Sequence, residues 1–257
     1  MDHVPSQLEH DADALGGNER PALSGARRAL FAALALLAAI GFAALGVWQV
    51  ERRAWKLDLI ERVEARIHAL PATPPPVAAW PRLDMQDAEY RRVRLTGTFD
   101  HGNETLVQAL TERGAGFWVL TPLRTPQGIV LVNRGFVPPE RRAPQARSAG
   151  QAGGTATVTG LMRASEPKGG FLRPNDPAAD RWHSRDVAAI ARARNLGNVA
   201  PFFVDADASP NPGGYPVGGL TMVRFRNTHL VYALTWFALA ALSGAAAVLA
   251  LRMRGGR

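Results

Sequence analysis

Two long apolar stretches lie near the ends of the chain, and a region of mixed pattern separates them. Residues 29–50 and residues 230–251 each run for 22 positions without a charged side chain. About 20 apolar residues are enough for an α-helix to cross the hydrocarbon core of a bilayer. The pattern therefore predicts two transmembrane helices, one over 29–50 and one over 230–251, with a large domain held between them.

The helical pattern continues beyond the first apolar stretch. Ile60, Val63, Ile67 and Leu70 recur at spacings of three or four residues, which is typical of one face of an amphipathic helix. The proline-rich segment 71–76 then ends the pattern. We therefore expect the first helix to extend past the membrane surface into the intervening domain.

From Arg91 onward the pattern changes to alternation. Val93, Leu95 and Phe99 alternate with polar residues, as in a strand that buries one face. Turn residues separate further short segments of the same kind, and a helix that Ser184 caps and Gly197 closes lies among them. The fold class expected is a membrane α+β protein in which two transmembrane helices flank a β-rich domain, either an antiparallel sheet or a small barrel. The strands expected lie over 92–99, 105–110, 117–123, 129–136, 155–163, 202–205 and 220–225.

The charges that flank the apolar stretches predict an orientation. Arg20, Arg27 and Arg28 precede the first, and three more arginines follow the second. The short segments that flank transmembrane helices on the cytoplasmic side are enriched in Lys and Arg. We therefore expect a multi-pass protein of the cell inner membrane with both termini in the cytoplasm. The domains expected are a disordered cytoplasmic tail over 1–28, the two spans, a periplasmic β-rich domain over 51–229 that includes the helical extension, and a cytoplasmic tail over 252–257.

The first apolar stretch shares one feature with a signal peptide, the basic residues that precede it. Its 22 apolar residues exceed the core of an ordinary signal sequence, and no small-residue cleavage site follows. We expect an uncleaved anchor.

The composition narrows the classes of partner and of chemistry. The net charge of +8 permits nucleic acid or anionic lipid as partner, but no basic run is interleaved with aromatic residues, so we expect membrane lipid and no nucleic acid. The absence of cysteine excludes disulfides, iron–sulfur clusters and thiolate metal sites. No hydrolase, phosphate-loop or dinucleotide motif is present, and we therefore do not expect an enzyme.

A histidine stands at the mouth of the second span. His229 is the only histidine next to a span, and Tyr232 and Trp236 follow it on the same helical face. Neutral imidazole is an ordinary axial ligand of heme iron, so this face is a candidate ligand site with His229 on the metal. The alternative is that the three side chains only anchor the helix at the membrane interface.

The end of the first span carries a comparable face formed by Trp48, Arg52 and Trp55. Two indoles beside a guanidinium can stack on a porphyrin edge and pair with a propionate, or they can form an ordinary aromatic belt with a snorkelling arginine. Because both faces belong at the same membrane level, we expect one site shared between the helices. Arg226 is a further propionate candidate.

Asn133, Arg134 and Gly135 lie at the end of the predicted strand 129–136. Gly135 permits a positive φ angle, and Asn133 can brace a turn. The motif is either a structural bend or a surface loop through which Arg134 meets a heme edge or a partner protein.

Five segments, taken together and in order, resemble the surfeit locus protein family of cytochrome c oxidase biogenesis factors. They are 45–49 with the basic residues that follow, 93–99, 130–138, 158–163 and 226–237, so the resemblance covers roughly residues 29–252. Phe136 is the one departure, since the family usually has tryptophan there.

The resemblance implies a chaperone of respiratory chain biogenesis that binds heme a as transient cargo and assists its insertion into oxidase subunit I. It implies no catalysis. Subunit I is the partner that it implies, and heme a synthase is a further candidate partner. A membrane scaffold that stabilises subunit I and never holds heme is the alternative.

Overall fold

The computed structural model describes residues 25–151, 153–167, 169–170, 173–221, 223, 225 and 227–252. These fall into two compact units. The helical unit takes its described residues from the chain up to Leu57 and from Arg226 onward, and the barrel unit comprises Asp58–Phe225.

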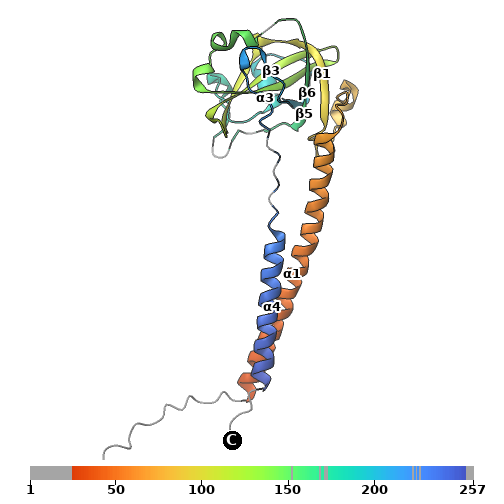
Figure 1. Ribbon diagram of the computed structural model, residues 1–257, viewed down its shortest axis with the longest axis vertical. Coiled ribbons are helices and arrows are strands. Elements are labelled where there is room, and N and C mark those ends of the chain that lie inside the picture. The colour runs from red at the N-terminus through yellow and green to blue at the C-terminus, as the bar shows by residue number, and fades with distance from the viewer. Residues whose placement is uncertain are drawn as a thin grey trace, which may run out of the picture. The chain divides into compact units, whose positions relative to one another are not determined.

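Two long helices that lie side by side form the helical unit (Figure 1). Helix α1 runs from Gly25 to His68, and its residues up to Leu57 belong to this unit, whereas α4 is His229–Arg252. Among the described residues, these two helices are long and apolar enough to cross a membrane. The prediction of long apolar helices over 29–50 and 230–251 is therefore confirmed.

Small residues let α1 and α4 approach closely. Ala32, Ala247 and Ala250 form a buried cluster. A Cβ atom on Gly46 would lie 2.6 Å from the ring of Phe237, so only glycine allows that ring to pack at this position. Contact through small residues is how helices associate where lipid removes the hydrophobic driving force.

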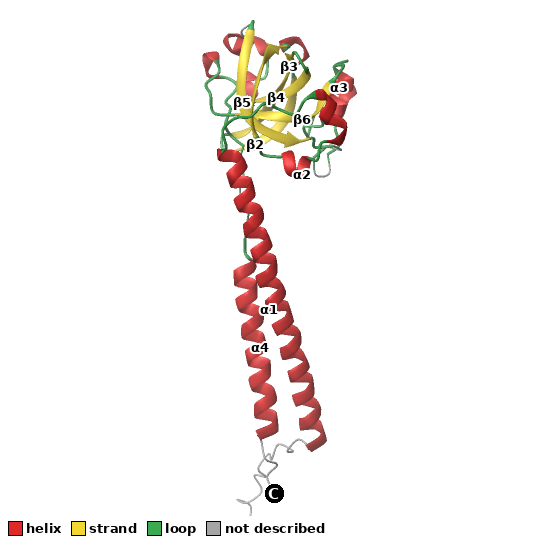
Figure 2. Ribbon diagram, turned by 90° about the vertical axis from the view of Figure 1, so that its right-hand side faces the viewer, coloured by secondary structure: helices red, strands yellow, loops and turns green. Residues whose placement is uncertain are grey.

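The barrel unit is a closed ring of strands (Figure 2). Within the described residues, the hydrogen-bonded order is β1-β5-β6-β4-β3-β2, and pairing of Phe99 with Leu123 joins β1 to β3 and closes five of the strands into a barrel. Strand β2 extends the sheet outside the ring. The strands are β1 (Arg92–Phe99), β2 (Thr105–Thr111), β3 (Gly114–Thr125), β4 (Gly128–Val137), β5 (Thr155–Ala164) and β6 (Val199–Ala206).

The expectation of a small barrel is confirmed, with one departure from antiparallel pairing. Strands β4 and β6 are parallel, and in the described part of the chain every other neighbouring pair is antiparallel. The reason is topological. Strand direction cannot alternate all the way round a ring with an odd number of strands, so one pair must be parallel.

Strand β4 is buried on both faces and organises the core. Val130 and Val132 pack inside the barrel with Phe202, whereas Leu131 points outward and packs with Ile190 and other residues beneath α3. Helix α3 (Val187–Ala193) therefore covers the outer face of the sheet. The described barrel unit also contains the last turns of α1, from Asp58 to His68, and the single-turn helix α2 (Met85–Ala88).

The prediction that Ser184 caps α3 and that Gly197 closes it is wrong. Asp186 caps the helix, since its carboxylate accepts a hydrogen bond from the Ala189 amide at 3.0 Å. Ser184 instead donates to the carbonyl oxygen of Glu166 at 2.6 Å. The left-handed residue after the helix is Asn195, with φ of 52°, and not Gly197.

The continuation of α1 past the apolar stretch is confirmed. Val63 is buried, and Arg66 Nη1 donates to the Gln86 carbonyl oxygen at 2.9 Å, which ties this part of the helix to the barrel unit. The expected contribution of Leu70 is wrong, because the helix ends at His68 and Leu70 is 90% exposed. The last predicted strand, 220–225, is also wrong, since its described residues lie in no strand.

Candidate functional site

The first turn of α4 meets α1 through a polar contact. His229 Nδ1 lies 2.8 Å from Gln49 Oε1, and Gln49 is buried. An amide oxygen only accepts hydrogen bonds, so the contact places the imidazole proton on Nδ1 and leaves a lone pair on Nε2. This is the tautomer that binds heme iron through Nε2, and a hydrogen bond on the other ring nitrogen is the usual support of a metal-binding histidine.

Gln49 is the residue that the sequence reasoning missed. It lies within the first apolar stretch, next to Trp48, and it is the last uncharged polar residue of that stretch. Polar residues inside apolar helices are costly unless they find a partner, and they commonly mark functional positions. That signal was available in the sequence, but the partner became evident only once the two helices were placed together.

The residues that follow His229 divide between two environments. Ala233 is buried, and Trp236 stacks on Phe42 of α1 with ring centroids 5.6 Å apart. Tyr232 is 54% exposed. His229 and Trp236 thus both contact α1, while the Tyr232 side chain is left accessible at the surface of the helical unit.

Trp48, Arg52 and Trp55 form their own exposed group on α1. The Arg52 guanidinium lies over the Trp55 ring, 4.0 Å from its centroid, and both indoles are about half exposed. The residue of α1 that meets His229 is Gln49, one position after Trp48 and therefore about 100° round the helix. The two faces are adjacent. A site shared between the helices, and contact of Trp48, Arg52 and Trp55 with heme, stay predictions.

Arg134 lies in the barrel unit. Asn133, Arg134 and Gly135 are buried within β4, so of the two alternatives the surface loop is wrong and the structural bend is the one observed. Asn133 braces the bend by accepting from the Gly135 amide at 3.2 Å, and a Cβ atom on Gly135 would lie 2.1 Å from the Val217 carbonyl oxygen. The bend is structural. A heme contact by Arg134 stays a prediction, and Arg226 lies outside the described residues.

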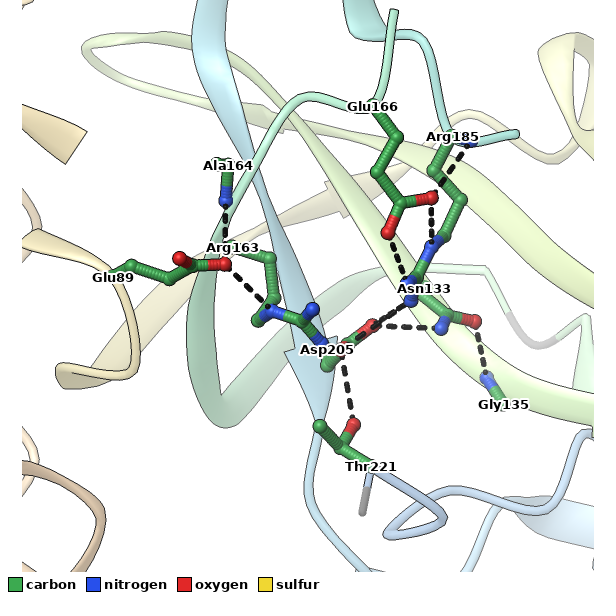
Figure 3. A network of polar contacts seen from close by, with 9 residues as sticks. All are labelled: Glu89, Asn133, Gly135, Arg163, Ala164, Glu166, Arg185, Asp205 and Thr221. Carbon is green, nitrogen blue, oxygen red and sulfur yellow. Dashed lines mark hydrogen bonds and ion pairs between the residues drawn. The ribbon is translucent and has the colours of Figure 1, made fainter. Parts of the chain in front are cut away.

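A buried network of charges joins three strands of the barrel (Figure 3). Asp205 of β6 is 2% exposed and accepts from Arg163 Nη1 at 2.8 Å, from Arg185 Nη1 at 3.2 Å and from Asn133 Nδ2 at 2.7 Å. The hydroxyl of Thr221 donates to the same carboxylate at 3.0 Å. The two arginines are therefore neutralised from within the domain, and the network holds β4, β5 and β6 together.

The carboxylate of Glu166, which pairs with Arg185 at the edge of this network, predicts a pH dependence of the stability of the fold. Burial alone would raise the pKa of Glu166, but the hydrogen bonds and charge of Arg185 outweigh it and lower the pKa below the ordinary 4.5. The ion pair therefore stabilises the fold fully above pH 4.5, and its contribution is lost as the pH falls through the lower pKa of the folded state. Urea unfolding at a series of pH values should show Glu166→Gln less stable than the parent at pH 7, with the two curves converging in acid. Glu112→Gln is the control for loss of an exposed carboxylate, and a constant gap between the parent and Glu166→Gln at all pH values would contradict the prediction.

No group of three or more His, Asp or Glu side chains in the described part of the chain is arranged to hold a metal ion.

The described structure defines a class: a closed β-barrel inserted between two helices that are candidate membrane anchors, with a histidine held by a glutamine where those helices meet. The chain matches the model of the SURF1 family over residues 36–241 and belongs to that family. The resemblance inferred from the five sequence segments is thereby confirmed.

Relatives from distant organisms match most of the chain. Human surfeit locus protein 1 is 38% identical over 217 residues, which cover 77% of this chain and 69% of the human protein. The Xenopus tropicalis protein of the same name is 36% identical over 239 residues, 86% of this chain and 76% of the relative. A SURF1-like protein of Monosiga brevicollis is 38% identical over 226 residues, 82% and 84% of the two chains.

Proposed function

We propose that this protein is a non-catalytic assembly factor of cytochrome c oxidase that binds heme a as transient cargo and assists its insertion into subunit I. Membership of the SURF1 family supports the assembly role. The observation that carries the heme role is the contact between His229 Nδ1 and Gln49 Oε1, because it leaves Nε2 free to coordinate iron. Heme a would bring the iron and the propionates, and the protein would bring one axial nitrogen and the groups that orient the ring.

The side chains near His229 in the helical unit suit a porphyrin chemically. Tyr232 and the indoles of Trp48 and Trp55 expose aromatic surface, and Arg52 offers a guanidinium for a propionate. In this proposal His229 ligates the iron, Gln49 fixes the ring orientation of the imidazole, and Arg52 and Arg226 hold propionates.

The proposal includes an arrangement in the membrane. α1 and α4 span the inner membrane with both termini in the cytoplasm, and the barrel unit lies in the periplasm. The arginine-rich flanks of the two apolar stretches support this orientation. Subunit I is the partner proposed, and heme a synthase is the proposed source of the cargo.

The scaffold that never holds heme is the second candidate. One observation favours it: the His229–Gln49 contact gives each side chain a hydrogen-bond partner without any ligand, as polar pairs between membrane helices do. The two candidates differ in whether Nε2 of His229 is used.

Purification from a host that makes heme a separates them. We expect the parent protein to carry heme a, measured as a pyridine hemochrome spectrum. Gln49→Ala should weaken retention by about 10- to 100-fold, because it removes the hydrogen bond that orients the ligand. Gln49→Glu keeps an acceptor and should retain heme better than Gln49→Ala.

Thr235→Ala is the matched control, since the Thr235 hydroxyl donates to the Val231 carbonyl oxygen of its own helix, at 2.9 Å. A colourless parent protein that co-purifies with subunit I would favour the scaffold. Heme retention that is the same in Gln49→Ala and in the parent would remove Gln49 from the site.

A further inference from the structure

A cavity of about 250 Å³ opens in the barrel unit, between the first half of β5 and the segment 207–212 that follows β6. Part of its wall is apolar and is formed by Val132, Val158 and Ala206. Arg134 also lines it and is the sole cation among the described lining residues. The cavity therefore combines an apolar surface with one fixed positive charge.

The guanidinium of Arg134 is deeply buried and incompletely partnered. Arg134 is 4% exposed, and its Nη2 donates to Gly150 O at 2.5 Å and Asn211 Oδ1 at 2.9 Å, both neutral acceptors. Within the described part of the chain, Nε and Nη1 have no hydrogen-bond partner. The guanidinium lies over the Phe99 ring, 4.7 Å from its centroid, and burial lowers the pKa of Arg134 to about 10.

The acidic residues nearest to this charge are engaged elsewhere. Glu104 forms a buried ion pair with Arg147, with Oε2 2.9 Å from Nη1. Asp207, the one carboxylate on the described cavity wall, lies 3.8 Å from Arg92 Nη2 and accepts from the Ser209 amide at 3.0 Å. Buried charges in proteins are normally paired, so a guanidinium held only by neutral acceptors beside a cavity is suited to receive an anion.

We propose that this cavity binds a small monocarboxylic acid, with the carboxylate beside Arg134 and the alkyl part against Val132 and Val158. The carboxylate would replace the neutral oxygen of Asn211 as acceptor, and its plane matches the planar fork of a guanidinium. A phosphate dianion suits the site less well because it would meet a single cation and an apolar wall. The site does not rest on the proposed function, since Arg134 belongs to the barrel unit and is not among the residues that the proposed function assigns to the iron or the propionates, which belong to the helical unit.

The test uses the full chain in detergent and sodium butyrate as the probe. Sodium chloride and sodium phosphate at equal ionic strength are the references. Butyrate should raise the midpoint of thermal unfolding along a saturating curve, as a ligand specific for the folded state does, and the two inorganic salts should not. Arg134→Gln should weaken butyrate binding at least tenfold, as judged by calorimetry.

A second variant leaves Arg134 in place and should change the affinity for butyrate in the opposite direction. Asp207→Asn removes the like charge from the cavity wall and keeps an oxygen for the Ser209 amide, so it should bind butyrate about threefold more tightly. A response to butyrate no larger than that to chloride overturns the proposal. So does equal binding by the parent and Arg134→Gln, or, should Arg134→Gln fail to fold, an Asp207→Asn variant that binds no more tightly than the parent.

Discussion

His229→Ala is expected to abolish the binding of heme a while leaving a folded protein. The substitution removes the one imidazole of the described helical unit, and with it the nitrogen proposed to ligate the iron. The described residues of that unit hold no second histidine, and the chain has no cysteine. The expected measurement is a pyridine hemochrome spectrum without heme a, at an expression level matched to the parent.

The cost of this substitution to stability should be modest. Gln49 loses its partner, and an unsatisfied buried amide costs about 1–3 kcal/mol. The packing of α1 against α4 should survive, because it rests on the buried alanines and on the stacking of Phe42 with Trp236.

His68→Ala is the matched control, because His68 is exposed and pairs with Glu64, at 3.2 Å on the same helix. It should retain heme as the parent does. Equal heme occupancy in His229→Ala and in the parent would sink the ligand assignment and leave the scaffold as the better account. In cells that rely on this factor, His229→Ala should lower the heme content of subunit I.

Asp205→Ala is expected to be the most destabilising single change in the barrel unit. It leaves Arg163 and Arg185 buried without their common partner, and it removes the acceptor for Asn133 and Thr221. Breaking a buried ion pair by deleting one side costs about 3–5 kcal/mol. Urea unfolding followed by circular dichroism should show this loss in the free energy of unfolding.

Two further variants test whether the loss of stability in Asp205→Ala comes from the buried charge. Asp205→Asn keeps hydrogen-bonding atoms but loses the charge, so its loss should be intermediate. Asp176→Ala removes a carboxylate whose ion pair with Arg181 is exposed, and it should change the free energy of unfolding little. A loss for Asp205→Ala no greater than that for Asp176→Ala would show that the network in Figure 3 does not stabilise the barrel.

The elements that depend on local pattern could be predicted from the sequence. Alternation and the turn residues between segments located β1 to β5 within a few residues, and the long apolar runs gave the two membrane-like helices. The closure of the ring could not be predicted in this way. It depends on Phe99 meeting Leu123 and on β6 lying beside β4, and local periodicity carries no information about such pairings.

The candidate site was predictable to the same extent. His229 could be singled out because an imidazole at the end of an apolar run is unusual. Its partner could not, since choosing between Trp48 and Gln49, adjacent in sequence, requires the rotation of α1 about its axis. The Asp205 network was missed for a related reason: its members Asn133 and Asp205 lie 72 positions apart and carry no shared motif.

The place of β6 in the ring has a consequence for biosynthesis. Among the described strands β6 is synthesised last, yet it lies between β5 and β4 and pairs with both. A nascent chain that ends before Val199 therefore has an open sheet with two unpaired edges, and such edges recruit other chains. The barrel can close only after β6 has been synthesised, so any delay in translation over residues 165–198 prolongs the aggregation-prone state.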